Sequence, residues 1–180
     1  MKEQAKNFAE KAHQGQKRKN TDAAYITHPI RVAEKLERAG LPEELVCAGY
    51  LHDVVEDTIY EIEDIEAEFG PRVAELVAAH TEDKSKSWQE RKQHTIDALR
   101  DAENEVKYLV VADKLDNLLG LEQDIDSNGD AVWQNFNAGV EQQKWYNTSI
   151  VENMYVGLSP EEIPSYFAEY EDAVRRVFHS

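Results

Sequence analysis

The hydrophobic residues of this chain recur at helical spacing almost from end to end. In the first segment they fall at positions i, i+3, i+4 and i+7, the pattern of a helix with one apolar face; they are Ala5, Phe8, Ala9 and Ala12. The same spacing predicts helices over 32–39, 45–51, 62–69, 73–77, 106–121 and 163–174. No run alternates between apolar and polar residues as a half-buried strand does. We therefore expect an all-α fold.

Capping residues mark several of the expected helix boundaries. Gly40 closes the second helix, and Gly70 followed by Pro71 stops the helix over 62–69. The sequence Ser-Trp-Gln-Glu at 87–90 fits a capping box, and Ser-Pro-Glu-Glu at 159–162 fits another, with proline at the first helical position. Two polar stretches are expected to be loops, at 82–87 and 124–130.

The chain is expected to fold as one unit. Its 180 residues are the size of a single domain, and it contains no internal repeat, low-complexity stretch or linker. We expect a compact bundle of about ten helices over 1–180. A core over about 5–122 would carry the functional motifs, and helices within 130–180 would pack against it.

Cysteine content and hydropathy predict a cytoplasmic protein. Cys47 is the single cysteine, which excludes an internal disulfide and a cysteine-based zinc cluster. The N-terminus lacks the apolar segment of a signal peptide. No uncharged run is long enough to span a bilayer, so no membrane association is expected.

The net charge of −16 argues against nucleic-acid binding, which requires cations that neutralise phosphates. The charge is nevertheless uneven, because residues 1–40 hold nine lysines and arginines and five acidic residues, a net of +4. This basic region would either guide a small anion to one place or form solvated helix faces. The composition alone leaves both interpretations open.

The run His52-Asp53-Val54-Val55-Glu56-Asp57 places four ionisable groups within six residues. On a helix, His52 and Glu56 share one face, and Asp53 and Asp57 share another. The run follows apolar residues, which indicates that it lies at the inner end of a buried helix. Burying so many ionisable groups is costly unless they bind a cation or pair with one another.

Two further residues are candidate ligands for the same cation. His28 precedes Pro29 at a helix start, and Asp113 lies on the core-facing side of the helix over 106–121. Imidazole and carboxylate together suit Mn²⁺, Fe²⁺ or Zn²⁺. Taken singly, however, His28 would serve as a helix cap and Asp113 as a buried salt-bridge partner.

The order of these residues resembles that of the HD superfamily of metal-dependent phosphohydrolases. More closely, the chain resembles the hydrolase domain of the Rel/SpoT alarmone enzymes and the free-standing small alarmone hydrolases. The resemblance covers residues 8–118 and is carried by FAEKAHQGQKRK (8–19), YITHP (25–29), LHDVVEDT (51–58), FGPRV (69–73), ERK (90–92) and ADKLDN (112–117).

This resemblance implies a metal site and a hydrolytic pair. One divalent cation, usually Mn²⁺ in this family, would be held by four ligands, which are His28, His52, Asp53 and Asp113. The neighbouring Glu56 and Asp57 match the acidic pair that orients and activates the attacking water.

The resemblance also implies nucleotide contacts. Arg18 would stack on the purine, for which its planar guanidinium is suited. Lys19 would lie beside it, and Asn117 would hydrogen-bond the nucleotide from one helical turn after Asp113. Arg91 and Lys92 would contact the polyphosphate or act as surface ion-pair partners. Tyr146 would border the nucleotide pocket or be a core aromatic residue.

The activity implied is hydrolysis of the 3′-diphosphate of ppGpp or pppGpp, which yields GDP or GTP and pyrophosphate. The partner would be a small purine nucleotide, and the oligomeric state stays open. The chain contains no synthetase or regulatory segment, so we expect hydrolysis alone. Two alternatives stay open, an HD phosphohydrolase acting on another nucleotide, such as an adenosine alarmone, and a non-catalytic nucleotide-binding module.

The sequence departs from the family pattern at three places near the expected pocket. The loop at 20–24 lacks the usual glycine and proline, Asp116 replaces another residue type, and the segment 80–87 is longer and more polar. We expect these departures to alter base and phosphate preference and to leave the metal chemistry intact. His80 and His94 are expected to lie on helix surfaces or to cap helices.

Overall fold

The computed structural model describes residues 1–18, 21–135 and 138–179. These residues form an all-α fold, as the periodicity predicts, and their only β pairing is an isolated bridge between Lys17 and Ala24. The described α-helices are α1 (Lys2–Ala12), α2 (Thr27–Arg38), α3 (Glu43–Leu51), α4 (Val54–Asp57), α5 (Ile62–Phe69), α6 (Pro71–His80), α7 (Trp88–Asp101), α8 (Asn104–Asn128), α9 (Val140–Met154) and α10 (Tyr166–Phe178). Two 3-10 helices accompany them, η1 (Gly129–Asn135) and η2 (Pro160–Glu162).

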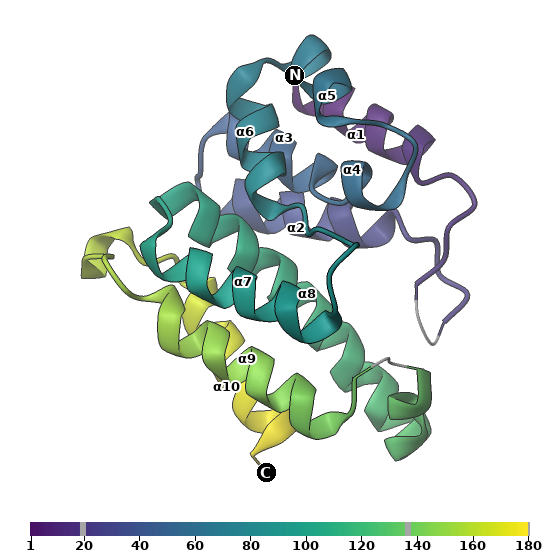
Figure 1. Ribbon diagram of the computed structural model, residues 1–180, viewed down its shortest axis with the longest axis vertical. Coiled ribbons are helices and arrows are strands. Elements are labelled where there is room, and N and C mark those ends of the chain that lie inside the picture. Colours follow the sequence, from purple (N-terminus) through teal and green to yellow (C-terminus); the bar gives the residue numbers. More distant parts are fainter. Residues whose placement is uncertain (19–20, 136–137, 180) are drawn as a thin grey trace.

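The helices are arranged along the long axis of the molecule. Figure 1 shows α1 to α6 gathered at the end that carries the N-terminus and α9 and α10 at the end that carries the C-terminus, with α7 and α8 between them. Helix α8 packs against α2, α3 and α6 on one side and against α9 and α10 on the other. It therefore connects the two ends of the fold and presents residues to both.

A glycine sets the close approach of α2 and α3. A Cβ atom added at Gly49 would lie 2.9 Å from Leu36 Cδ1 and 3.1 Å from Ala33 Cα, both on α2. A larger residue here would require the Leu36 side chain and the Ala33 backbone to shift, so glycine permits the close approach. The contact brings α2, which carries His28 in its first turn, against the last turn of α3, which His52 follows.

Several predicted helix boundaries are confirmed. Helix α5 ends at Phe69, after which Gly70 adopts a φ of 91° and Pro71 begins α6. The Ser87 hydroxyl accepts a hydrogen bond of 3.1 Å from the backbone N–H of Glu90, which caps α7 as expected. The predicted loop at 82–87 is also non-helical.

The predicted loop at 124–130 is wrong. Helix α8 continues through this segment to Asn128, and η1 follows directly. The reason is an apolar face that extends beyond the predicted helix end. Ile125 lies one turn after Leu121 and packs against the hydrophobic core, so its burial outweighs the polar character of the residues around it.

The capping box at Ser159 starts a shorter element than expected. The Ser159 side chain caps only η2, and the closing helix α10 begins at Tyr166. Pro164 explains the interruption, because proline disfavours the helical conformation in the residue before it, and Ile163 is extended, with a ψ of 110°. Among the described helices, none combines the length and the apolar character needed to cross a membrane.

Candidate functional site

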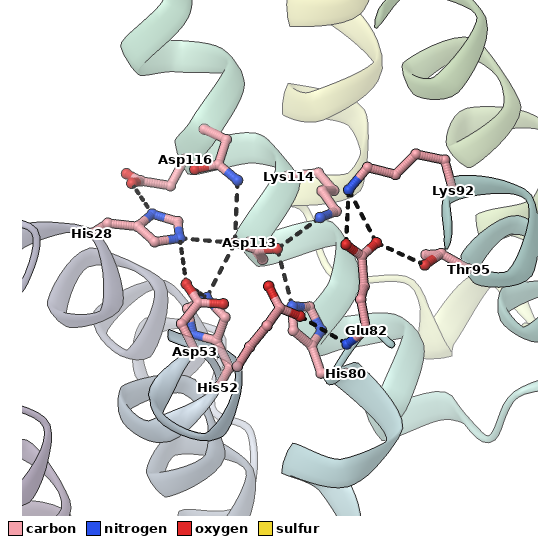
Figure 2. A network of polar contacts seen from close by, with 12 residues as sticks. His28, His52, Asp53, His80, Glu82, Lys92, Thr95, Asp113, Lys114 and Asp116 are labelled. Carbon is pink, nitrogen blue, oxygen red and sulfur yellow. Dashed lines mark hydrogen bonds and ion pairs between the residues drawn. The ribbon is translucent and has the colours of Figure 1, made fainter. Parts of the chain in front are cut away.

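Two helices and one helix junction bring the four predicted metal ligands together. His28 lies in the first turn of α2, and Asp113 lies in the middle of α8. His52 and Asp53 occupy the junction between α3 and α4, where the helix predicted to run through both of them is interrupted. Figure 2 shows His28, His52 and Asp53 gathered around Asp113.

The four side chains form a buried cluster. Asp113 Oδ1 lies 2.8 Å from His28 Nε2 and 3.2 Å from His52 Nε2, while Asp53 Oδ2 lies 2.9 Å from His52 Nε2. One donor atom from each residue lies within 4.8 Å of all the others, and all four residues are buried. Two imidazoles and two carboxylates at this separation can surround one cation.

The electrostatics of the cluster also fit a cation. Burial opposes ionisation of Asp113, but Lys114 and His52 hold the pKa of its carboxyl well below the ordinary value. Burial likewise opposes protonation of His52, but Asp53 and Asp113 raise its pKa well above the ordinary value. Two ionised carboxylates in a buried place require positive charge nearby, and this mixed nitrogen and oxygen donor set suits a divalent transition metal.

The orientation of His52 is fixed by a backbone carbonyl. Its Nδ1 lies 2.7 Å from the oxygen of Gly49. Because a carbonyl only accepts hydrogen bonds, the proton of a neutral His52 sits on Nδ1. Its Nε2 then faces Asp53 and Asp113, where a bound cation would take the Nε2 lone pair.

His80 is a residue that the sequence interpretation missed. The expected surface or capping role is wrong, because its side chain is buried and its Nε2 lies 3.0 Å from Asp113 Oδ2. Burial lowers the pKa of His80, so the ring is neutral near pH 7. Helical spacing contained the signal, since His80 follows Val73, Leu76 and Val77 at i+7, i+4 and i+3, on the face that α6 buries.

The predicted acidic pair lies beside the cluster. Glu56 and Asp57 belong to α4, and one carboxylate oxygen from each lies within 4.8 Å of the other and of Asp53. Glu56 Oε1 accepts a hydrogen bond of 2.7 Å from the backbone N–H of Glu82. Burial is the main cause that raises the pKa of Glu56 to about 7. Asp57 instead pairs with Lys84, at 2.7 Å.

Arg91 and Lys92 meet at a single carboxylate. Lys92 Nζ lies 3.0 Å from both oxygens of Glu82, and Arg91 Nη1 lies 3.3 Å from Oε1. Both cations therefore form ion pairs with Glu82, as the alternative to polyphosphate contact expected. They are not surface residues, however, because both are largely buried and both line a cavity. Lys114 adds a third cation, with Nζ 3.0 Å from Asp113 Oδ2 (Figure 2).

Two cavities adjoin the cluster. The first has a volume of about 950 Å³ and is lined by Asp53, Glu56 and Asp113, among others. The second has a volume of about 740 Å³ and lies toward α9. Four residues line both cavities, which therefore meet beside the cluster; these residues are Tyr25, Lys92, Lys114 and Asn117.

The second cavity contains most of the predicted nucleotide contacts. Arg18 Nη2 lies 3.4 Å from Asn117 Oδ1, and Asn117 Nδ2 lies 3.3 Å from Asp113 Oδ1. Tyr146 is buried and also lines this cavity, so it is both a core aromatic residue and a wall of the pocket. Lys19 lies outside the described residues.

Asp116, one of the departures from the family pattern, lies closer to the metal ligands than expected. Its Oδ2 is 2.6 Å from His28 Nδ1 (Figure 2). This departure therefore concerns a predicted metal ligand as well as the pocket, while its effect on base and phosphate preference stays a prediction. Asp116 also lines the second cavity.

Comparisons with known proteins agree with this geometry. A family model described as "HD domain" matches residues 5–140, which is more than half of the chain. A zebrafish (Danio rerio) protein named guanosine-3′,5′-bis(diphosphate) 3′-pyrophosphohydrolase MESH1 is 38% identical over 118 residues. That match covers 64% of this chain and 66% of the zebrafish protein, slightly less than two thirds of its length.

Solved structures extend the likeness to the whole fold. The crystal structure of lmo0812 from Listeria monocytogenes EGD-e has a TM-score of 0.82 and 50% identity, covering 87% of this chain and 96% of that one. A metazoan orthologue of SpoT, described as hydrolysing ppGpp, has a TM-score of 0.79 and 30% identity, covering 97% of this chain and 93% of that one. From these matches and the buried histidine and aspartate cluster, we conclude that the chain belongs to the HD-domain family.

Proposed function

We propose that this protein is a metal-dependent phosphohydrolase that removes the 3′-diphosphate of ppGpp or pppGpp as pyrophosphate. The observation that carries this proposal is the position of the buried His28, His52, Asp53 and Asp113 cluster, beside an acidic pair and where two cavities meet. The names of the zebrafish relative and of the metazoan SpoT orthologue support the same reaction.

The cluster would hold one divalent cation, and we propose Mn²⁺. Histidine nitrogens and carboxylate oxygens are ligands that Mn²⁺ accepts. When bound, such a cation lowers the pKa of water and polarises a phosphate oxygen. The chain holds the ligands in position, since the Gly49 carbonyl orients the ring of His52 and Asn117 contacts Oδ1 of Asp113.

Glu56 would act as the general base. Its carboxyl group is close to Asp53, and its raised pKa of about 7 suits a group that accepts a proton at neutral pH. The hydrogen bond from the backbone of Glu82 holds one carboxylate oxygen and leaves the other available to a water molecule. Asp57 would assist by orienting that water.

The second cavity would hold the nucleoside. A planar guanidinium can stack on a purine, and Arg18 lies at this cavity together with Trp88 and Tyr146. Asn117 would hydrogen-bond the nucleotide between the base and the reaction centre. Lys19, which follows Arg18 directly, is proposed to lie near the same nucleotide.

The first cavity would hold the diphosphate. Arg91, Lys92 and Lys114 supply positive charge beside the cluster, and cations of this kind stabilise phosphoryl groups during transfer. Glu82 balances the charge of Arg91 and Lys92 before substrate binds. We therefore expect these cations to exchange part of their pairing with Glu82 for phosphate oxygens.

We further propose that residues 1–180 act as one HD-type unit in the cytoplasm. Helix α8 carries Asp113 and Asn117, whereas α9 carries Tyr146. The proposed substrate pocket thus needs the motif-bearing helices and the C-terminal helices together, and a nucleotide substrate of this kind would be met in the cytoplasm.

A nucleotide panel tests the proposed substrate. The protein is incubated with Mn²⁺ and with nucleotides that carry a 3′-diphosphate, a 5′-triphosphate or a 2′- or 3′-monophosphate, on guanine and on adenine. We expect pyrophosphate from the guanosine 3′-diphosphates. Phosphate release from another member of the panel, with the guanosine 3′-diphosphates left intact, would assign that nucleotide as the substrate. Tight binding of ppGpp without turnover would support a non-catalytic binding module instead.

A further inference from the structure

Asp116 connects a predicted metal ligand to an arginine. Its Oδ2 lies 2.6 Å from His28 Nδ1 and 3.1 Å from Arg31 Nη2, and its Oδ1 lies 2.7 Å from Arg31 Nε. Asp116 comes from α8, whereas His28 and Arg31 are one turn apart on α2. The three side chains therefore join the two helices immediately beside the metal-ligand cluster.

The donors around Asp116 determine what it does to His28. Arg31 donates two hydrogen bonds to the carboxylate in a bidentate arrangement, which favours its ionised form. An ionised carboxylate only accepts hydrogen bonds, so the 2.6 Å contact requires a proton on His28 Nδ1. A neutral His28 then has its lone pair on Nε2.

Nε2 faces the cluster, where a bound cation would take this lone pair. His28 Nε2 lies 2.8 Å from Asp113 Oδ1 and 3.8 Å from Asp53 Oδ2. His28 itself is buried, so its ring cannot exchange this arrangement for contacts with bulk water. Gly49 gives His52 the same orientation through a backbone carbonyl, but His28 obtains it from a side chain that the sequence can change.

We propose that Asp116, supported by Arg31, is a positioning residue that holds His28 in the tautomer and ring orientation required to bind the metal. A carboxylate on the outer nitrogen of a metal-binding histidine also makes the histidine a stronger ligand, and removing such a carboxylate weakens metal binding about 10- to 100-fold. The inference rests on the proposed function only in that the cluster binds a divalent cation.

Metal affinity measured without nucleotide tests this role. Mn²⁺ is titrated calorimetrically into the metal-free wild type and into Asp116→Ala, and we expect binding to the variant to be about 10- to 100-fold weaker. Asp116→Asn keeps the volume of the side chain but presents a neutral amide to His28, so its affinity should also fall. Both variants should keep the circular dichroism spectrum of the wild type.

Glu122→Gln is the matched control. Glu122 also lies on α8 and pairs with one arginine through two hydrogen bonds, from Arg176 Nε at 2.8 Å and Nη2 at 3.1 Å. It has the same kind of ion pair as Asp116 but touches neither cavity nor cluster. Its Mn²⁺ affinity should equal that of the wild type.

The tautomer supplies a second readout. In metal-free protein with ¹⁵N-labelled histidine, the His28 signals of the wild type should show a protonated Nδ1, and Asp116→Ala should lose this preference. Wild-type Mn²⁺ affinity in Asp116→Ala, with a change only in KM for the nucleotide, would overturn the inference and make Asp116 a substrate contact. Absence of Mn²⁺ binding by the wild type would overturn it as well.

These readouts separate the inference from the proposed reaction. Neither the titration nor the ¹⁵N spectrum uses a nucleotide. If the wild type and its variants bound Mn²⁺ in the predicted order of affinities but the wild type left ppGpp intact, only the proposed function would be contradicted.

Discussion

At the residue scale, the candidate site depends on how each buried polar group is satisfied. Asp113 contacts His28 and His52 through Oδ1, and His80 and Lys114 through Oδ2. Oδ1 thus faces the proposed metal position, while Oδ2 is held by the ring of His80 and the ammonium group of Lys114. Such outer contacts commonly determine how well a metal ligand is placed.

Glu56→Gln tests the proposed base. The amide oxygen of glutamine can still accept the hydrogen bond from the backbone of Glu82, but the side chain can no longer take a proton. We expect kcat for ppGpp to fall about 10²- to 10⁴-fold, with Mn²⁺ affinity and KM nearly unchanged, as measured by steady-state kinetics and calorimetry. A variant with near-wild-type kcat would assign the base to another group.

Sequence reasoning identified individual residues unevenly. Residues in linear motifs were found because their spacing is visible in the chain, and the structure brings His28, His52, Asp53 and Asp113 into one cluster. The contacts of His80 with Asp113 and of Asp116 with His28 were missed. Periodicity along α6 places His80 on the buried face, but it does not specify contacts between separate helices, which are α6 with α8 for His80 and α2 with α8 for Asp116.

At the element scale, the separation of α2 and α3 controls the site. His28 lies in the first turn of α2, His52 directly follows α3, and Gly49 allows the two helices to pack closely. The sequence predicted both helices from their apolar spacing. It did not predict the extension of α8 to Asn128, because a polar composition obscured the apolar contact of Ile125.

Gly49→Ala should loosen this pair of helices. The new Cβ would overlap Leu36 and Ala33, and overpacking of this kind costs about 1–3 kcal/mol. We expect a lower free energy of unfolding in urea and weaker Mn²⁺ binding. Gly120→Ala is the control, since its Cβ would make only an ordinary contact of 3.5 Å with Arg18 Nη2. Equal stability of both variants would contradict the close packing of α2 and α3.

At the scale of the whole molecule, α8 links the proposed metal and nucleotide sites. It carries Asp113, Lys114 and Asn117 and packs against helices at both ends of the fold. The all-α class followed from hydrophobic periodicity, which samples the entire chain. The two cavities could not be predicted from periodicity, because residues distant in sequence, such as Arg18 and Tyr146, form their walls.

Metal removal should lower the stability of the whole molecule. A ligand that binds only the folded state stabilises it by about 2.7 kcal/mol at 100 times its Kd, which corresponds to about 5–10 °C in Tm for a chain of this size. We therefore expect a chelator to lower Tm by several degrees in wild type. The metal-free protein and Asp53→Ala should show no such chelator effect, and a Tm of the wild type that is independent of Mn²⁺ would contradict a metal site in the cluster.

We propose that the buried cluster and the acidic pair together cleave a guanosine 3′-diphosphate. The most direct measurement follows ppGpp turnover by wild type and Asp53→Ala, with Mn²⁺ and with chelator, and identifies the products by chromatography. We expect GDP and pyrophosphate only from wild type with Mn²⁺. Equal turnover by Asp53→Ala, or intact ppGpp after incubation with Mn²⁺-loaded wild type, would contradict it.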